Sequence, residues 1–216
     1  MKIEKIHLQH ILPDVFATES HIESDIWQRD IVFERGRNYL VESASGTGKS
    51  SLCSFIDGYR NDYQGIICFD QTNIRQYSLS EWTDIHRRNI SILFQDLRLF
   101  PELTALENVV LKNQLTRHKK KKEIKEFFEQ LNIADKLRTP VGHLSFGQQQ
   151  RVALIRALCQ PFDFILLDEP VSHLDSSNSG LLTSLLQQEA EQQGAGIIVT
   201  SIGQHPDMFY DNIYKL

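Results

Sequence analysis

The spacing of hydrophobic residues divides this chain into stretches with two different periods. Short apolar runs bounded by polar residues or glycine predict β-strands over residues 31–34, 38–42, 65–69 and 89–94. From Asp96 to about Leu144 the apolar side chains instead recur at intervals of three and four, which predicts helices. The chain therefore changes from a β-rich first part to a helical middle part.

The last third of the chain combines both patterns. An amphipathic helix is expected after Gly147, and another helix, from about Ser177 to Gln193, lies between strands at residues 164–167 and 196–200. Strands that alternate with helices in this way imply a mainly parallel sheet covered on both faces. We therefore predict an α/β fold with a β-rich N-terminal portion.

Composition and charge exclude several classes of protein to which this chain could belong. The 216 residues suit one domain, and 41% hydrophobic and 24% charged residues are ordinary for a soluble protein. A net charge of −5 argues against a dedicated nucleic-acid-binding protein, so no nucleic-acid partner is expected. No apolar run approaches the ~18–20 residues needed to span a bilayer. We expect a cytoplasmic chain, with any membrane-spanning part supplied by another chain.

A glycine-rich loop follows the strand at residues 38–42. Residues 43–50 read Ser-Ala-Ser-Gly-Thr-Gly-Lys-Ser, and a helix is expected to begin near Lys49. Glycines at 46 and 48 let backbone N–H groups approach phosphate oxygens, and the helix N-terminus adds a favourable partial charge. Lys49 is expected to reach the β- and γ-phosphates, and the Ser50 hydroxyl to bind Mg²⁺. An ordinary Gly/Ser-rich turn is the alternative.

Two adjacent acids follow the apolar run at residues 164–167. Asp168 is expected at the carboxyl edge of a buried strand, where ligands gather in open α/β sheets, and would hold Mg²⁺ through water. Glu169 would act on the attacking water as general base. Solvated loop charges are the alternative interpretation of this pair.

The run Leu144–Arg151, LSFGQQQR, lies between the loop and the acidic pair. Loop, run and acids in this order resemble the ATP-binding cassette (ABC) ATPases over nearly the whole chain. The resemblance implies a P-loop NTPase of the ABC type as a single domain over residues 1–216, with an N-terminal antiparallel β portion. A helical subdomain at about 96–158 would contain the signature run. The segment 94–109, FQDLRLFPELTALENV, looks most like the branch of lipoprotein-releasing and macrolide-efflux ATPases.

The resemblance also assigns roles outside the loop. Gln95 corresponds to the glutamine loop of the family, which senses the membrane partner, and its amide would bind Mg²⁺ or position water. In the family the signature run contacts the γ-phosphate bound by a second subunit, which implies a two-fold symmetric ATP sandwich. Ser145 would make that contact; a simple serine cap of a helix is the alternative. Residues 172–175 resemble the D-loop, which communicates between the two sites.

The residues expected to contact ATP are Ser43, Ala44, Ser45, Gly46, Thr47, Gly48, Lys49, Ser50, Ser51, Phe16, Ser145, Phe146, Gly147 and Gln148. The expected Mg²⁺ ligands are Ser50, Gln95 and Asp168, and the expected catalytic residues are Glu169, Gln95 and Ser201. Phe16 is the candidate for stacking on adenine; a packed loop phenylalanine is the alternative.

Three residues depart from the family pattern. Ser43 replaces glycine, which costs about 1 kcal/mol if the position needs a positive φ angle. Phe146 also replaces glycine, and its ring must point away from the nucleotide. Ser201 stands where a histidine should contact the γ-phosphate, and the loss of one such donor typically slows hydrolysis about 10- to 1000-fold. His205 would substitute only if its loop folds back.

The resemblance implies the energising subunit of an ABC transporter, which dimerises around ATP–Mg²⁺, as homodimer or heterodimer, and hydrolyses it. It would be peripheral to the inner face of the cell membrane through a permease on a separate chain. A degenerate cassette that binds ATP with little hydrolysis is the first alternative. A DNA-repair or chromosome-structure ATPase is the second, but fewer than 100 residues separate Ser50 from Leu144, too few for the long insertion of those proteins. We interpret the basic run at residues 117–122 as a solvated helix start; acidic lipid or nucleic acid are the alternative ligands.

Overall fold

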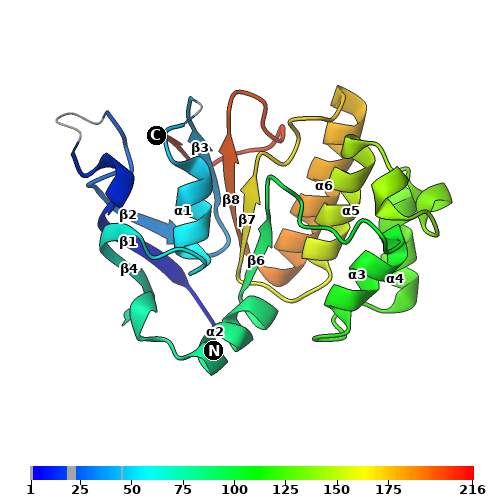
Figure 1. Ribbon diagram of the computed structural model, residues 1–216, viewed down its shortest axis with the longest axis horizontal. Helices are drawn as coiled ribbons and strands as arrows, with labels where there is room; N and C mark the ends of the chain where they lie inside the picture. The colour runs from blue at the N-terminus through cyan, green and yellow to red at the C-terminus, as the bar shows by residue number, and fades with distance from the viewer. Residues whose placement is uncertain (1, 19–22, 45) are drawn as a thin grey trace.

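The computed structural model describes residues 2–18, 23–44 and 46–216, and it contains two β-sheets with helix α1 (Lys49–Ile56) between them (Figure 1). An antiparallel sheet lies on one side of α1, and a parallel sheet lies on the other. The remaining long helices lie beyond the parallel sheet. The parallel sheet therefore occupies the middle of the molecule.

The parallel sheet has its strands in the order β6-β7-β8-β3-β9. Their bounds are Asn38–Glu42 for β3, Ile90–Leu93 for β6, Phe164–Asp168 for β7, Gly196–Ser201 for β8 and Asn212–Lys215 for β9. Each neighbouring pair is parallel. Strand β3, from the first quarter of the chain, is thus held between two strands from its last quarter.

The antiparallel sheet is built from the N-terminal part of the chain in the order β2-β1-β4-β5. Its strands are β1 (Lys5–Pro13), β2 (Asp30–Glu34), β4 (Tyr63–Phe69) and β5 (Thr72–Asn73). Both long pairings of β1 are antiparallel, and the pairing with β4 shifts register between Gln9 and Leu12. This sheet is the expected antiparallel β portion.

Four helices pack on the face of the parallel sheet opposite α1 (Figure 1). They are α3 (Ala105–Asn113), α4 (Lys121–Gln130), α5 (Phe146–Leu158) and α6 (Ser176–Gln193). Helix α2 (Leu79–Arg88) leads into β6, and short 3-10 helices occur at Asp14–Phe16, Ile74–Gln76, Ala134–Lys136 and Val141–His143. In the part of the chain that the structure describes, every helix is too short or too polar to cross a membrane.

The parallel sheet separates two hydrophobic clusters because successive side chains of a strand point to opposite faces. In β7, Phe164 and Leu166 enter the cluster that contains α1, whereas Ile165 and Leu167 enter the cluster that contains α3 to α6. A strand buried on both faces must be apolar at every position. This is why residues 164–167 form a continuous hydrophobic run ending at the carboxylate of Asp168.

The expected α/β fold, with a mainly parallel sheet and an antiparallel N-terminal portion, is confirmed. The hydrophobic pattern does not predict α2 or β9. Of the ten residues of α2 only Ile85 is buried, and β9 contains no buried residue. Helix α2 carries only three apolar residues, at intervals of three, and β9 is a four-residue edge strand, so the apolar pattern of each is short.

Candidate functional site

The carboxyl ends of three neighbouring parallel strands bring the predicted site residues to one edge of the sheet. Asp168 at the end of β7 is level with Thr200 in β8, and Ser201 is level with Glu42 at the end of β3. The glycine-rich loop follows β3 directly, and Glu169 follows Asp168. In open α/β sheets this edge is where ligands bind.

The glycine-rich loop has the backbone that its glycines predict. Gly46 and Gly48 have φ angles of 87° and 98°, and Gly48 caps the N-terminus of α1. Ser43 is not among the described residues with positive φ, so the backbone strain that a positive φ angle would cause at this serine is absent. The Ala44 carbonyl accepts hydrogen bonds from Thr47 Oγ1 (3.0 Å) and Ser43 Oγ (3.1 Å), which close the loop. Ser45 lies outside the described residues.

Two aromatic side chains hold the loop from outside. A Cβ atom on Gly48 would lie 2.9 Å from the Trp27 ring and 3.3 Å from the Phe16 ring, so only glycine fits there. Trp27 is buried and its indole N–H donates to the Thr47 carbonyl at 3.0 Å. Phe16, the predicted adenine-stacking residue, is thus beside the loop, and it also packs against the core cluster of α1. Trp27 is missed by sequence reasoning because nothing in the motif points to position 27.

Asp168 accepts a hydrogen bond on each of its carboxylate oxygens. The Ser50 hydroxyl donates to Oδ2 at 2.6 Å, and the Thr200 hydroxyl donates to Oδ1 at 2.7 Å. Ser50 and Asp168 are therefore adjacent, as predicted for two ligands of one metal ion. Thr200, which is fully buried, is a contact that the sequence does not predict.

These oxygens suit Mg²⁺ bound together with a phosphate ligand. Among the described residues no cluster of three or more His, Cys, Asp or Glu side chains forms a complete metal cage. Mg²⁺ is commonly bound by one or two protein oxygens, with phosphate oxygens and water completing its octahedron. Ser50, Asp168 and the Gln95 amide fit that kind of site.

Glu169 has an unusual backbone conformation for a side-chain-bearing residue. Its φ angle of 52° lies in the left-handed region, which costs about 1–2 kcal/mol for a residue other than glycine. Its N–H donates to the Thr200 carbonyl at 2.9 Å. Its carboxylate Oε1 lies 3.8 Å from Nζ of Lys49, a buried lysine whose amine also donates to the Ala44 carbonyl at 3.5 Å. Backbone strain held in place by neighbours is common at functional sites.

Two adjacent cavities open along this edge. One, of about 270 Å³, is lined by Gly46, Gly48, Lys49, Ser50, Ser51, Gln95, Glu169 and Ile202. The other, of about 280 Å³, is lined by Ser50, Cys53, Ser54, Phe94, Gln95, Asp96, Arg98 and Asp168. Gln95 and Ser50 line both, which places Gln95 beside the predicted metal ligands. The Ser51 hydroxyl, by contrast, accepts a hydrogen bond from the Arg60 guanidinium at 2.9 Å.

The structure does not present Ser201 to these cavities. Ser201 is fully buried, and its hydroxyl donates to the Gln204 carbonyl at 2.5 Å; the next residue, Ile202, lines the smaller cavity instead. His205 lines neither cavity: its Nε2 lies 4.0 Å from Oε1 of Glu42, and its ring packs against Tyr210. Neither side chain takes the place of the missing histidine in this structure.

The signature run begins helix α5 at a distance from both cavities, neither of which it lines. Ser145 is the N-cap residue, and it forms a reciprocal capping box with Gln148. Phe146 is 42% exposed and packs on the His173 ring, with centroids 4.3 Å apart. A Cβ on Gly147 would lie 2.9 Å from the His173 carbonyl oxygen, so glycine is needed for this close approach. Phe146 therefore faces outward and Gly147 is packed against residues 172–174, whereas Leu144, Gln150 and Arg151 of the run are buried.

Residues 29–172 match the sequence profile of the family described as ABC transporter. The matched segment includes the glycine-rich loop, Gln95, the signature run and the acidic pair. The chain belongs to the ABC transporter family. It is an ATP-binding cassette.

The cassette is similar to the ATP-binding proteins of several transporters. It is 32% identical to the uncharacterized ABC transporter ATP-binding protein YclH of Bacillus subtilis, over 80% of this chain and 76% of that protein. It is also 32% identical to the lipoprotein-releasing system ATP-binding protein LolD of Syntrophotalea carbinolica, over 80% and 77%. The glutamine transport ATP-binding protein GlnQ of Geobacillus stearothermophilus is 31% identical, over 83% and 74%. Near-equal identities to different transporters establish the family without selecting one cargo.

The fold of the cassette is also similar to a solved dimer. The dimeric structure of the bacterial ABC transporter cassette MJ0796 superposes with a TM-score of 0.77 at 27% identity, over 91% of this chain and 87% of that one. A post-hydrolysis dimer of MJ0796 bound to ADP and Pi gives 0.74 at 28% identity, over the same shares. The comparison extends beyond the matched profile, because it covers nearly the whole chain.

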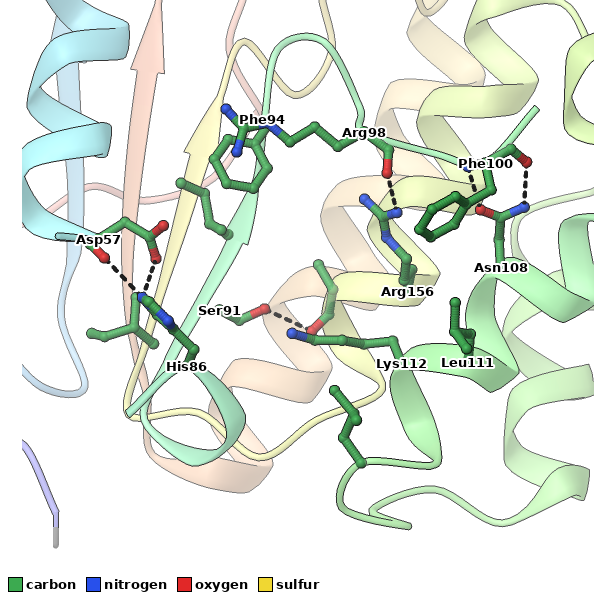
Figure 2. Close-up of a pocket in the computed structure, with 14 residues that line it drawn as sticks. Asp57, His86, Ser91, Phe94, Arg98, Phe100, Asn108, Leu111, Lys112 and Arg156 are labelled. Carbon is green, nitrogen blue, oxygen red and sulfur yellow. Dashed lines mark hydrogen bonds and ion pairs between the residues drawn. The ribbon is translucent and has the colours of Figure 1, made fainter. Parts of the chain in front are cut away.

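A larger cavity of about 420 Å³ lies on the cassette between α2 and β6 on one side and α3 and α5 on the other (Figure 2). Burial raises the pKa of Asp57 from its ordinary 3.8 to about 6, although the nearby His86, Lys112 and Arg98 oppose this rise. Burial also lowers the pKa of Lys112, and it lowers that of Arg156 to about 10. The cavity is thus a partly apolar recess with several desolvated charges.

Two arginines shape one wall of this cavity. Arg156 donates to the Leu97 and Arg98 carbonyls, both at 2.5 Å, and so fixes the segment that follows β6 (Figure 2). The Arg98 guanidinium in turn lies 3.6 Å above the Phe94 ring. Phe94 and Arg98 also line the cavity that contains Ser50 and Asp168. The recess and the nucleotide site therefore share a wall next to Gln95.

Proposed function

We propose that this cassette binds ATP with Mg²⁺, dimerises around two nucleotides and hydrolyses them slowly to power a membrane transporter. The observation that carries the proposal is the convergence of Lys49, Ser50, Asp168 and Glu169 along two adjacent cavities that share Ser50. Their residue types supply a cationic side chain for the phosphates, two metal ligands and a general base. An ATP-hydrolysing site needs this combination.

Each residue has a distinct role in the proposal. Lys49, which now contacts the Ala44 carbonyl and the Glu169 carboxylate, binds the β- and γ-phosphates when nucleotide enters. Ser50 and Asp168 hold Mg²⁺, which when bound neutralises charge on the phosphate oxygens. Glu169 accepts a proton from the attacking water, and Gln95 orients that water from the opposite wall. Phe16 stacks on the adenine.

Dimerisation is proposed because one copy presents an incomplete site. Phe146, near the start of the signature run, is exposed, and the run lines neither cavity at the phosphate loop. A second copy, or a second cassette, would bring its Ser145 and the N-terminus of its α5 to the γ-phosphate. The similar cassette MJ0796 has been solved as a dimer. We also propose that residues 96–158 act as the helical subdomain that carries the signature run to its partner.

We further propose that a permease on a separate chain binds over the cavity of Figure 2. Phe94 and Arg98 line both this cavity and the cavity at Ser50, so a segment seated there would contact the residues that flank Gln95. Such contact would place the cassette at the inner face of the cell membrane. Co-purification from native membranes, analysed by mass spectrometry, identifies the permease.

A cassette that binds ATP with little hydrolysis is the second candidate, and two observations favour it. The Ser201 hydroxyl is buried and donates to the Gln204 carbonyl, so it does not replace the missing histidine. Phe146 stands exposed on the surface that would meet the partner's nucleotide. Hydrolysis slower by about 10- to 1000-fold than with a histidine donor is the expected consequence.

The test is Mg²⁺-ATP turnover by the wild-type protein and by the Glu169→Gln and Ser201→His variants, together with equilibrium ATP binding. We expect slow wild-type turnover, only a small residual turnover with Glu169→Gln despite retained ATP binding, and faster turnover with Ser201→His. ATP-dependent dimers should accumulate in Glu169→Gln, measured by light scattering. Tight ATP binding with no turnover above the Glu169→Gln value in wild type or Ser201→His would leave the binding-only cassette.

A further inference from the structure

The backbone of Glu169 is held through its carbonyl oxygen as well as through its N–H. The Gln150 side-chain amide donates to the Glu169 carbonyl at 3.0 Å, and the Ser172 hydroxyl donates to the same oxygen at 3.2 Å. Together with the N–H bond to Thr200, these contacts surround a residue whose φ angle of 52° is unfavourable. The direction of the Glu169 side chain therefore depends on the positions of the groups that donate to its carbonyl oxygen.

Neither carbonyl donor lines either cavity beside the phosphate loop. Gln150 is only 2% exposed and lies in α5, a little over one turn beyond its N-cap, Ser145. Ser172 directly precedes His173, whose carbonyl would lie 2.9 Å from a Cβ on Gly147. The first turn of α5 and residues 172–174 are thus packed without space between them. A displacement of this packed unit moves both donors together.

We propose that Gln150 is a positioning residue that ties the Glu169 carboxylate to the position of helix α5. Because Ser145, Phe146 and Gly147 of the signature run form the start of that helix, whatever engages them acts on Glu169 through the Gln150 amide. When the run binds the nucleotide held by a second subunit, the general base Glu169 is thereby aligned. The inference rests on the proposed function, since it assumes that Glu169 is the base.

The geometry also explains why an amide is suited to this position. A neutral N–H donor satisfies the Glu169 carbonyl without placing a charge near the carboxylate and Lys49. A carboxylate at position 150 would repel both the carbonyl and Glu169. A thioether would fill the volume of the glutamine and leave the carbonyl with only the hydroxyl and the backbone N–H of Ser172, at 3.2 and 3.5 Å.

The experiment compares Gln150→Met with a matched control, Gln160→Met. Gln160 is 1% exposed, and its amide likewise donates to a backbone carbonyl, that of Ile90, at 3.0 Å, far from Glu169 in the sheet. Each variant loses the bonds of one buried amide, which for Gln160 include a longer one to the Pro161 carbonyl at 3.5 Å, so their losses of folding stability should be similar. We expect kcat to fall about 10- to 100-fold in Gln150→Met, with ATP affinity within about twofold of wild type. Gln160→Met should keep kcat within about twofold.

The double variant Glu169→Gln/Gln150→Met tests whether Gln150 acts through Glu169. If it does, the second substitution lowers the residual turnover of Glu169→Gln no further, because residues that act as a unit are not additive. Equal kcat in Gln150→Met and Gln160→Met, or parallel losses of kcat and ATP affinity, would overturn the proposal.

A second measurement keeps the proposal testable if the wild-type protein shows no turnover, which is a failure of the proposed function. Amide hydrogen exchange over residues 168–172 should then be faster in Gln150→Met than in wild type and unchanged in Gln160→Met. Equal exchange in both variants would overturn the positioning role on its own, whatever the outcome for hydrolysis.

Discussion

Trp27 acts on the phosphate loop from a position fifteen or more residues upstream of it. The indole N–H donates to the Thr47 carbonyl, and the ring fills the space beside Gly48. The loop backbone must keep its N–H groups turned inward before phosphate arrives, because ordering it at the moment of binding would cost affinity. The buried Trp27 side chain therefore preorganises the loop, whose own small residues provide few packing contacts.

Replacing Trp27 by phenylalanine separates the hydrogen bond from the ring. We expect Trp27→Phe to weaken ATP binding about 3- to 10-fold, because losing one neutral hydrogen bond costs about 1 kcal/mol and frees the Thr47 carbonyl. Isothermal titration with ATP measures the affinity. Trp82→Phe is the control, since Trp82 packs against Gly58 and Phe69, away from the loop. Equal losses of affinity in both variants would contradict this role.

At the scale of elements, the strongly periodic segments are predictable from the sequence and the weakly buried ones are not. Strands β3, β7 and β8 carry continuous apolar runs because both of their faces are covered, and the motifs at their ends follow. Helix α2 and strand β9 are not predicted, because α2 has only three apolar residues at intervals of three and β9 is a short, exposed edge strand. Contacts such as Thr200 to Asp168 join segments distant in sequence, and no local pattern records them.

The basic run at residues 117–122 is a second case in which the sequence does not predict which side chains are buried. The expectation of a solvated helix start is wrong for Lys119, which is only 9% exposed and forms a 2.6 Å ion pair with the buried Glu189 of α6. Lys122, three residues on, is fully in solvent and lies 3.6 Å from Glu126. Four consecutive lysines look alike in sequence, and only the packing of α4 on α6 distinguishes the buried one.

Lys119→Met should therefore destabilise the fold much more than Lys122→Met. Removing one partner of a buried pair leaves Glu189 uncompensated, which costs about 3–5 kcal/mol. The exposed pair should contribute less than about 1 kcal/mol. Urea denaturation followed by circular dichroism measures both free energies of unfolding. Lys119→Met/Glu189→Met should recover most of the loss, whereas a double variant as unstable as Lys119→Met would argue against an ion-pair origin.

At the scale of the whole molecule, the cavity of Figure 2 lies where the two hydrophobic clusters approach one another. Asp57, which follows α1, belongs to one side, and Lys112 of α3 and Arg156 of α5 belong to the other. Desolvated charges at such a boundary make the folded state sensitive to pH. The sign of that dependence follows from the direction of the Asp57 pKa shift.

Burial raises the pKa of Asp57 to about 6, so between pH 4 and 6 the folded state holds a proton that the unfolded state releases. The stability that this group contributes is present below about pH 4 and is lost as pH rises through 6. Asp57→Asn should remove this loss, which amounts to about 3 kcal/mol for roughly two pKa units. Urea denaturation at a series of pH values checks it. Asp62→Asn is the control, because hydrogen bonding to Arg60 lowers the pKa of that exposed carboxyl below the window.

The position of β3 between β8 and β9 has a consequence for synthesis on the ribosome. The phosphate loop leaves the exit tunnel soon after β3, which ends at Glu42, but both sheet neighbours of β3 begin only at Gly196 and Asn212. At about 5–20 residues per second, the loop waits on the order of 10 seconds for the strands that anchor it. During that interval both edges of β3 are open to pairing with other chains. Until both neighbours of β3 have been made, the phosphate loop lacks the sheet that holds it, so we expect nucleotide to assist only the late steps of folding of a nascent cassette.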